Sequence, residues 1–269
     1  MDKRFNGKAI YQPKPAAAEY SKYICQFYYG CTCGCTYCCN RRWKWNAPKL
    51  KVHFKDECMA LEVFGKELKA NLPELQKHGL MFCISTDPML PETINSTYDA
   101  VGICVRNKVP VKILTKRADF ASALLQYVYR DLYEGDFEKY VAIGFTLTGH
   151  DELEPHASTN AERIEAMRKL HEAGFKTWAS IEPIINFESS LQMIKETRGC
   201  CNLYKIGLLS GKKYDRDDLL DFIADVNAKA HLKPMFKVYF KDSLLAQAGV
   251  SRSELSGNCV DRDYNMFND

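Results

Sequence analysis

The sequence of 269 residues lacks long apolar runs, and no stretch approaches the roughly 18–20 apolar residues of a membrane-spanning helix. Its start, MDKRFNGKAIYQPKPAAAEY, lacks the apolar h-region of a secretory signal peptide. Internal repeats, low-complexity segments and an interdomain linker are also missing. We therefore expect a globular cytoplasmic protein with no membrane partner.

The chain also lacks a strong excess of one charge, with 37 Lys and Arg against 34 Asp and Glu and a net charge of +3. Such a balance permits a nucleic-acid partner without indicating one. Cysteine, by contrast, is plentiful, with 12 residues. A chain of this length buries a core without disulfides, and cytosolic thiols stay reduced. The cysteines therefore indicate a metal site or catalysis.

Strand-like and helix-like segments alternate along the chain. This alternation predicts an α/β protein with a parallel sheet. The strands and helices form about six β-α units, followed by a last strand. Six such units fit either a doubly wound sheet or an incomplete barrel, and periodicity does not choose between them. We expect one domain over residues 1–269, with a core of about 24–210 and a C-terminal extension of about 211–269, whose polar tail after Ala248 wraps or frays. The strands are predicted at 24–30, 79–86, 109–116, 140–148, 175–185, 202–209 and 234–240, and the helices at 54–72, 92–106, 118–132, 158–174, 189–197 and 213–230.

Two local details accompany these elements. The helix at 54–72 is expected to turn Met59, Val63 and Leu68 toward the core. The helix at 158–174 is expected to be capped by Ser158 or Thr159.

One short loop, GCTCGCTYCC, carries five cysteines within nine positions, namely Cys31, Cys33, Cys35, Cys38 and Cys39. The spacing Cys31-x3-Cys35-x2-Cys38 suits three thiolates that bind three irons of a 4Fe-4S cluster. The fourth iron would then be open to a small molecule. Structural zinc fits less well, because it prefers paired C-x2-C knuckles and only one such pair is present.

The motif GCTCGCTYC resembles the cluster motif of radical S-adenosylmethionine enzymes, C-x3-C-x-aromatic-C. Three later segments, FCISTDPMLPETINSTYDA, VPVKILTKRADF and LEPHASTNAERIEAMRKLHEAGFKTWASIEPII, are similar to the strand-end motifs of the spore photoproduct lyase-like branch. The resemblance covers about residues 24–210. It implies a partial (β/α)6 TIM-type barrel that binds a 4Fe-4S cluster and S-adenosylmethionine.

The resemblance and the strand ends together suggest cofactor-binding residues. Tyr37 takes the aromatic position near the adenine. In α/β barrels, ligands bind at the carboxyl ends of the strands, where Ser85, Lys116, Thr146, Ser180 and Glu182 are expected. In the lyases, a serine, a lysine and a serine do this work; Ser85 and Lys116 match the first two and Thr146 matches the third loosely.

Cys83 is the candidate catalytic residue. In the lyases, a cysteine two residues before the first of those serines returns a hydrogen atom to the product radical. Cys83 precedes Ser85 by two, and residues i and i+2 of a strand share a face. The alternative is a buried core thiol. Glu154 and Arg163 also fit the branch pattern, and we expect them to form a buried ion pair that fixes their loop.

The basic, aromatic stretch NRRWKWNAPKLK (40–51) directly follows the cysteine motif. Cationic and planar side chains hold phosphates and stack on bases, so Arg41, Arg42, Trp43 and Lys44 are candidate nucleic-acid contacts. The alternative is a surface loop whose tryptophans pack on the barrel.

These expectations combine into one functional prediction, which the resemblance implies. Cluster-bound S-adenosylmethionine would be reductively cleaved to a 5′-deoxyadenosyl radical that abstracts hydrogen from the substrate. The substrate would be a thymine lesion in DNA or another nucleic-acid component, as in lyase-type DNA repair. Alternatives are radical modification of RNA, a nucleotide or a peptide, and a nonenzymatic iron–sulfur or zinc module that binds nucleic acid. An electron donor such as a flavodoxin or ferredoxin would be a partner.

Overall fold

The structure is a computed structural model of the chain, and it describes residues 8–38, 50–129, 137–232, 235–255 and 257–268. The nucleic-acid candidates Arg41, Arg42, Trp43 and Lys44 lie outside the described residues, as does Cys39. Within the described part, no helix combines the length and the hydropathy that a bilayer span requires.

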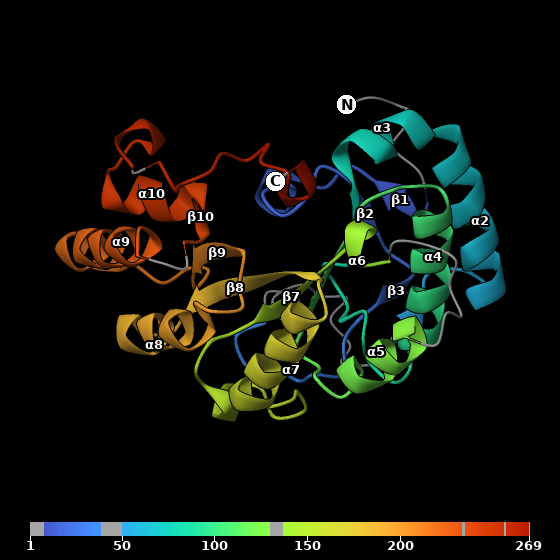
Figure 1. Ribbon diagram of the computed structural model, residues 1–269, viewed down its shortest axis with the longest axis horizontal. Coiled ribbons are helices and arrows are strands. Elements are labelled where there is room, and N and C mark those ends of the chain that lie inside the picture. Colours follow the sequence, from blue (N-terminus) through green and yellow to red (C-terminus); the bar gives the residue numbers. More distant parts are fainter. Residues whose placement is uncertain (1–7, 39–49, 130–136, 233–234, 256, 269) are drawn as a thin grey trace.

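A mostly parallel sheet forms the centre of the protein (Figure 1). The order of its eight described strands is β1-β2-β5-β6-β7-β8-β9-β10, with only β1 antiparallel to its neighbour. Strands β3 (Tyr28–Tyr29) and β4 (Lys51–Val52) pair separately. The strands of the main sheet are β1 (Ile10–Tyr11), β2 (Ile24–Cys25), β5 (Leu80–Phe82), β6 (Val111–Thr115), β7 (Val141–Thr146), β8 (Lys176–Ile184), β9 (Leu203–Leu208) and β10 (Lys237–Phe240).

The larger helices pack on one face of this sheet, which we call the outer face. Alternate strand residues such as Ile143 and Phe145 join the helices in one hydrophobic cluster, because successive side chains of a strand point to opposite faces. The helices are α2 (Glu57–Ala70), α3 (Leu72–His78), α4 (Ile94–Arg106), α5 (Ala121–Tyr129), α7 (Asn160–Glu172), α8 (Phe187–Thr197), α9 (Arg216–Ala230) and α10 (Asp242–Ala248), and the short α6 is Phe137–Tyr140.

The opposite, inner face of the sheet packs against other segments of the chain than the outer helices. Its side chains, including Met81, Ala142 and Trp178, pack against Ala17 of helix α1 (Pro15–Ala18) and against Met266 near the C-terminus. Figure 1 shows α1 and the C-terminus between the two groups of outer helices. The tail after Ala248 therefore wraps back onto the sheet, and Cys259 also forms a β-bridge to Val238.

The predicted α/β class and the predicted alternation of strands and helices are confirmed. The two edge strands of the described sheet, β1 and β10, do not pair with one another. The extension after residue 211 contributes β10 to the same sheet as the core. Helix α7 has the expected cap: the Thr159 side chain accepts from Glu162 N, and Glu162 in turn accepts from Thr159 N.

Three details of the prediction are wrong. The segment 24–30, predicted as one strand, forms β2 in the main sheet and β3 in the separate pair. In α2, Leu68 is buried and Val63 packs against the core as predicted, but Met59 is 43% exposed. Ala60 and Phe64 complete the buried side of the helix. The strand predicted at 79–86 ends at Phe82, because the chain bends from Ile84 onward to form the loop beneath the cysteines.

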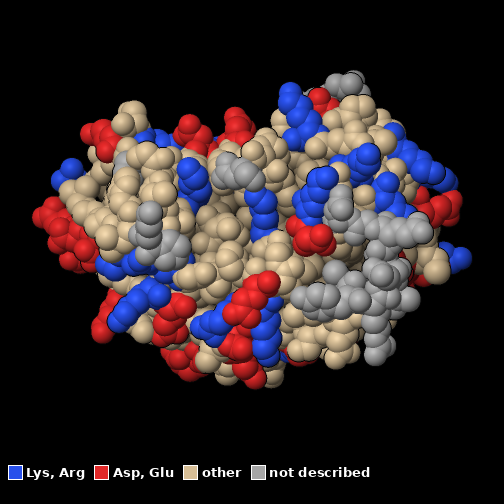
Figure 2. Space-filling model, viewed as in Figure 1, with Lys and Arg blue, Asp and Glu red and all other residues tan. Residues whose placement is uncertain are grey.

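Both signs of charge occur across the face shown in Figure 2, with local differences in their density. Acidic side chains gather at the end where α9 lies, and lysines and arginines are more frequent over the α2 and α3 end. Asp217 and Asp218 belong to the acidic end, in the first turn of α9, where carboxylates complement the helix dipole.

Candidate functional site

The cysteine loop (residues 31–38) is held by the segment between β7 and α7. Thr36 N donates to Leu153 O at 2.9 Å, and His156 N donates to Cys33 O at 3.3 Å. Gly34 has φ +69°, and a Cβ there would lie 2.9 Å from the His156 ring. Both the backbone angle and the close approach therefore require glycine.

Four thiols of this loop lie in one small cluster of packed side chains. Cys33 and Cys35 are buried, and Cys31 and Cys38 pack against them with Tyr37. All are free thiols. A hydrogen bond from Cys33 lowers the pKa of Cys31, whereas burial raises the pKa of Cys35. The loop therefore brings the three predicted ligands, Cys31, Cys35 and Cys38, into one neighbourhood.

These thiols do not converge on a single point. Among the described residues, no group of three His, Cys, Asp or Glu side chains is placed to hold one metal ion. A mononuclear site needs all its ligand atoms within about 2.3 Å of the ion. A cubane cluster instead gives each thiolate its own iron, so this finding concerns single-ion sites.

Asp87 connects the ends of β5 and β6 beneath the loop. Its buried carboxylate accepts from Thr115 Oγ1 at 2.7 Å, from Lys116 N at 2.7 Å and from Met89 N at 3.0 Å. Its Oδ2 also lies 3.8 Å from the Cys33 thiol. The role of Asp87 as an anchor depends on groups about 30 residues away along the chain.

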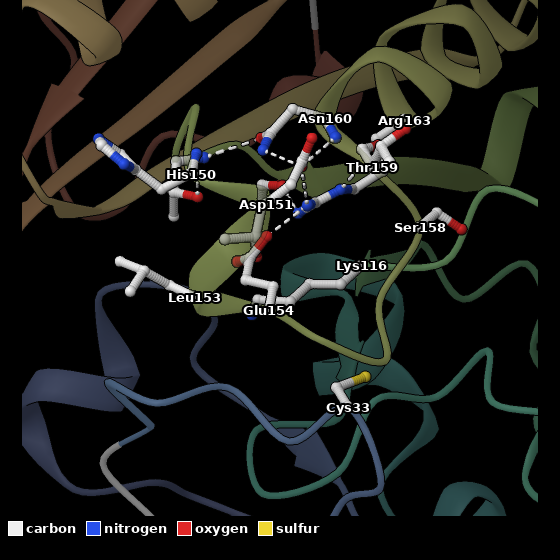
Figure 3. Close-up of polar contacts among 12 residues, drawn as sticks. Cys33, Lys116, His150, Asp151, Leu153, Glu154, Ser158, Thr159, Asn160 and Arg163 are labelled. Carbon is white, nitrogen blue, oxygen red and sulfur yellow. Dashed lines mark hydrogen bonds and ion pairs between the residues drawn. The ribbon is translucent and has the colours of Figure 1, made fainter.

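Tyr37, Glu154 and Arg163 form a chain of polar contacts, of which Figure 3 shows the part between Glu154 and Arg163. Tyr37 OH donates to one oxygen of Glu154, and Arg163 Nη2 donates to the other. Arg163 Nη1 also donates to Thr146 O at 2.6 Å. The expected Glu154–Arg163 ion pair is confirmed, with both side chains fully buried. Its partner on the cysteine loop, Tyr37, was not foreseen.

Lys116 follows β6 and extends toward this chain of contacts (Figure 3). Its Nζ lies 5.7 Å from the centre of the Tyr37 ring. Burial acts to lower the pKa of Lys116, but Tyr37, Cys35, Glu154 and Asp87 together hold that pKa well above its ordinary value. A cationic side chain therefore stands beside the thiols, where it can pair with a carboxylate.

Cys83 and Ser85 lie on the bend after β5 rather than on the strand. Cys83 Sγ donates to Thr86 O at 2.9 Å, and Ser85 Oγ donates to Tyr28 O at 3.3 Å. The expectation that they share one face of a strand is therefore wrong, because the strand ends before both. Burial raises the pKa of the Cys83 thiol to about 12, so it carries its proton at neutral pH.

Ser180 and Glu182 lie together in a second polar group on the inner face. Ser180 Oγ is 2.8 Å from Tyr20 OH, and Glu182 accepts from Tyr20 OH and from Lys241 Nζ, the latter at 2.6 Å. Gly207 leaves room for this pair, because a Cβ there would lie 2.8 Å from the side chains of Glu182 and Lys241. Sequence reasoning missed Tyr20 and Lys241, since neither belongs to a local motif.

A cavity of about 650 Å³ opens beside the cysteine loop. Its lining includes Cys31, Arg117 and His156. A small molecule can therefore reach the loop from solvent.

Comparison with known proteins finds a relative of this chain. The chain is 26% identical over 214 residues, or 74% of each chain, to a protein of Methanocaldococcus jannaschii that bears the name Uncharacterized protein MJ0683. No family model and no solved structure matches the chain. The relative's name states no function. The function of this chain is therefore inferred from the geometry of the site.

Proposed function

We propose that this chain is a radical S-adenosylmethionine enzyme of the spore photoproduct lyase-like kind. One observation carries the proposal. Cys31, Cys35 and Cys38, at the spacing of a 4Fe-4S motif, lie in one packed cluster beside the cationic Lys116.

The arrangement of layers supports a partial TIM-type barrel as the framework. A doubly wound sheet has helices on both faces, whereas here α2–α5 and α7–α10 contribute to one cluster on the outer face. The inner face packs against α1 and the C-terminal segment. A parallel sheet covered by helices on one side is the arrangement of a barrel wall.

The residues fit a 4Fe-4S cluster with bound S-adenosylmethionine. Thiolates are the ligands that iron–sulfur clusters use, and the three cysteines are free. Lys116 would pair with the carboxylate of the methionine moiety, and Tyr37 would lie beside the adenine. When bound and reduced, the cluster and S-adenosylmethionine supply a 5′-deoxyadenosyl radical that abstracts a hydrogen atom from the substrate.

The remaining contacts of the site would hold these residues in place. Asp87 fixes the backbone of Lys116 and the Cys33 side of the loop. Glu154 fixes Tyr37 through its hydroxyl and is itself held by Arg163. Side chains that are held by such supporting contacts keep the reacting groups at the distances and orientations that the reaction requires.

Ser85 and Thr146 remain candidate contacts for the cofactor at the ends of β5 and β7. Ser180 and Glu182 are candidates at β8, where they lie with Tyr20 and Lys241. That group stands on the inner face, so we place these two residues toward the ribose or the substrate rather than beside Lys116.

Cys83 supports a lyase-like reaction on a thymine lesion or another nucleic-acid component. A hydrogen-atom donor must carry its S–H, and the raised pKa of Cys83 keeps the thiol protonated. Cys31 and Asp87 are among the groups whose charge acts on this thiol, so it lies near the cluster loop. We propose that Cys83 returns a hydrogen atom to the product radical.

Anaerobic reconstitution with iron and sulfide, followed by S-adenosylmethionine and dithionite, tests the proposal. We expect cluster absorbance and 5′-deoxyadenosine from the wild type, and neither from Cys35→Ala. Cys58→Ala is the control, because Cys58 is an exposed thiol of α2. A fully loaded wild type that yields no 5′-deoxyadenosine would falsify the enzyme proposal.

A further inference from the structure

Three lysines on separate strands converge on one short segment at the inner face of the sheet. Lys112 lies on β6, Lys205 lies on β9, and Lys241 directly follows β10. All three ammonium groups lie against Glu19 and Tyr20, the two residues that follow α1. The meeting point is therefore built by parts of the chain that are far apart in sequence.

The lysines differ in what they contact. Lys112 Nζ donates to Tyr20 O at 3.1 Å, and Lys205 Nζ donates to the same oxygen at 3.2 Å and also to Glu19 O. These acceptors belong to neutral peptide groups. Lys241 has a carboxylate partner, with Nζ 2.6 Å from Glu182 Oε2 and 4.0 Å from Glu19 Oε2.

The lowered pKa values of Lys112 and Lys205 show that this arrangement disfavours their charged forms. Burial lowers the pKa of Lys112 to about 8. Burial, together with the charges of Lys112 and Lys241, lowers the pKa of Lys205 well below its ordinary value, although Glu19 and Glu182 oppose this. Buried ammonium groups are best satisfied by charged, hydrogen-bonding partners. Lys112 and Lys205 donate to neutral peptide oxygens, and a bound anion at this point would give both of them a charged acceptor.

The segment over the lysines, residues 10–20, is called the strap below. At one end β1 pairs with β2. At the other end the Glu19 carboxylate accepts from Tyr239 OH at 3.1 Å and from Asp242 N at 2.7 Å. The strap thus runs across the inner face from one edge of the sheet to the other.

We propose that Lys112, Lys205 and Lys241 form a binding site for a phosphate group, which the strap covers and which the ligand reaches by displacing Glu19 and Tyr20. In the covered state Glu19 O and Tyr20 O accept from Lys112 and Lys205, and these two carbonyl oxygens would take the positions of phosphate oxygens. Lysine binds phosphate as a point charge, which suits a group approached from three strands.

This inference rests on the lysines and not on the proposed radical chemistry. The phosphate could be free or could belong to a nucleotide, and both sources offer the same oxygens. Binding would be measured on the purified chain whatever its cluster content. Failure of the 5′-deoxyadenosine assay would therefore leave the test intact.

Competition between strap and ligand makes the site testable. Glu19→Ala/Tyr20→Phe removes the strap contacts to Tyr239 and Glu182 but keeps all three lysines. Because a ligand that must displace a covering segment binds more weakly by the fraction of open protein, we expect this variant to bind inorganic phosphate at least about tenfold more tightly than the wild type. Calorimetric titration at constant ionic strength measures the difference.

Further variants assign the binding to the lysines. Adding Lys112→Met to the strap variant should abolish phosphate binding, whereas adding Lys212→Met, at an exposed lysine, should not. A single thymidine 5′-phosphate titration, beside inorganic phosphate, distinguishes a nucleotide from a free anion. Hydrogen exchange of residues 10–20 in the wild type should increase when phosphate is added.

Two outcomes would overturn the proposal. The first is a strap variant that binds no phosphate although its circular dichroism matches that of the wild type. The second is binding that persists unchanged with Lys112→Met, which would mean an adventitious ion only. Lys112→Gln serves in place of the methionine variant if the latter does not fold.

Discussion

Glu154 and Arg163 form an ion pair in which neither side chain is exposed to solvent. The pair joins the loop after β7 to the first half of α7, and the second oxygen of Glu154 accepts from the hydroxyl of Tyr37. One carboxylate thus connects the cysteine loop to the helix that packs behind it. The position of the proposed cluster ligands depends on this contact.

Removing that carboxylate should destabilise the protein. Glu154→Gln leaves the buried charge of Arg163 without its partner, so we expect the free energy of unfolding in urea to fall by about 3 kcal/mol. Glu165→Gln, on the exposed side of α7, is the comparison, and its change should stay within about 0.5 kcal/mol. Equal stability of the two variants would contradict the role assigned to Glu154.

Asp87→Asn tests the anchor between β5 and β6. The amide can accept through one oxygen only, and its NH₂ faces the Lys116 amide or the Thr115 hydroxyl. We expect a loss of about 2 kcal/mol in the free energy of unfolding. Asp99→Asn, at an exposed position of α4, should change it little. The idea fails if the two substitutions cost the same.

Gly34→Ala tests the contact between the cysteine loop and His156. A residue with a side chain is strained at φ +69°, and its Cβ would clash with the His156 ring. We expect a loss of about 1–3 kcal/mol in stability and a lower iron content after reconstitution. Gly199→Ala is the control, since a Cβ at Gly199 meets nothing within 4 Å. Unchanged iron loading in Gly34→Ala would argue against a closely fitted loop.

The raised pKa of Cys83 predicts how its reactivity depends on pH. The thiolate is the reactive form, so alkylation of Cys83 by iodoacetamide should be slow at pH 8 and rise about tenfold per pH unit toward pH 12. Peptide mass spectrometry would follow Cys83 beside the exposed Cys58 in the same sample. A Cys83 that reacts as fast as Cys58 at pH 8 would show that its thiolate is not suppressed.

The raised pKa of Cys83 also determines how the stability of the protein depends on pH. An unfolded thiol loses its proton near pH 9, whereas folded Cys83 keeps it to about pH 12. The contribution of Cys83 is therefore complete below pH 9 and is lost as the pH rises from 9 to 12. Cys83→Ala should make the stability profile less steep in that window, which urea titrations between pH 8 and pH 11 would detect.

Lys116→Gln tests the proposed carboxylate contact. If Lys116 pairs with S-adenosylmethionine, loss of its charge should raise the Kd for that cofactor at least about tenfold, or 1.4 kcal/mol. Equilibrium dialysis of the reconstituted protein measures the Kd, with Lys169→Gln on α7 as the control. Equal Kd values for the two variants would remove Lys116 from the cofactor site.

Some of the site was predictable because its signals are local. The spacing of Cys31, Cys35 and Cys38 is set by neighbouring residues, and the structure brings these thiols together. The buried pairing of Glu154 with Arg163 was also foreseen, over a separation of nine residues. In α2 the core contacts of Val63 and Leu68 were predicted, but Met59 is exposed, because tertiary packing rather than propensity decides which residues of a helix are buried.

The sequence by itself determined the alternation of strands and helices, the cap of α7 and the set of candidate thiols. Those features follow from periodicity, capping and spacing, which act over a few residues. Only the tertiary structure decided that Cys83 and Ser85 lie beyond the end of β5, and that Tyr20 joins Ser180 and Glu182. It also decided that Lys205 meets Glu19, which is 186 residues away. No local pattern encodes such a meeting, because the curvature and order of the strands determine which distant side chains share the inner face.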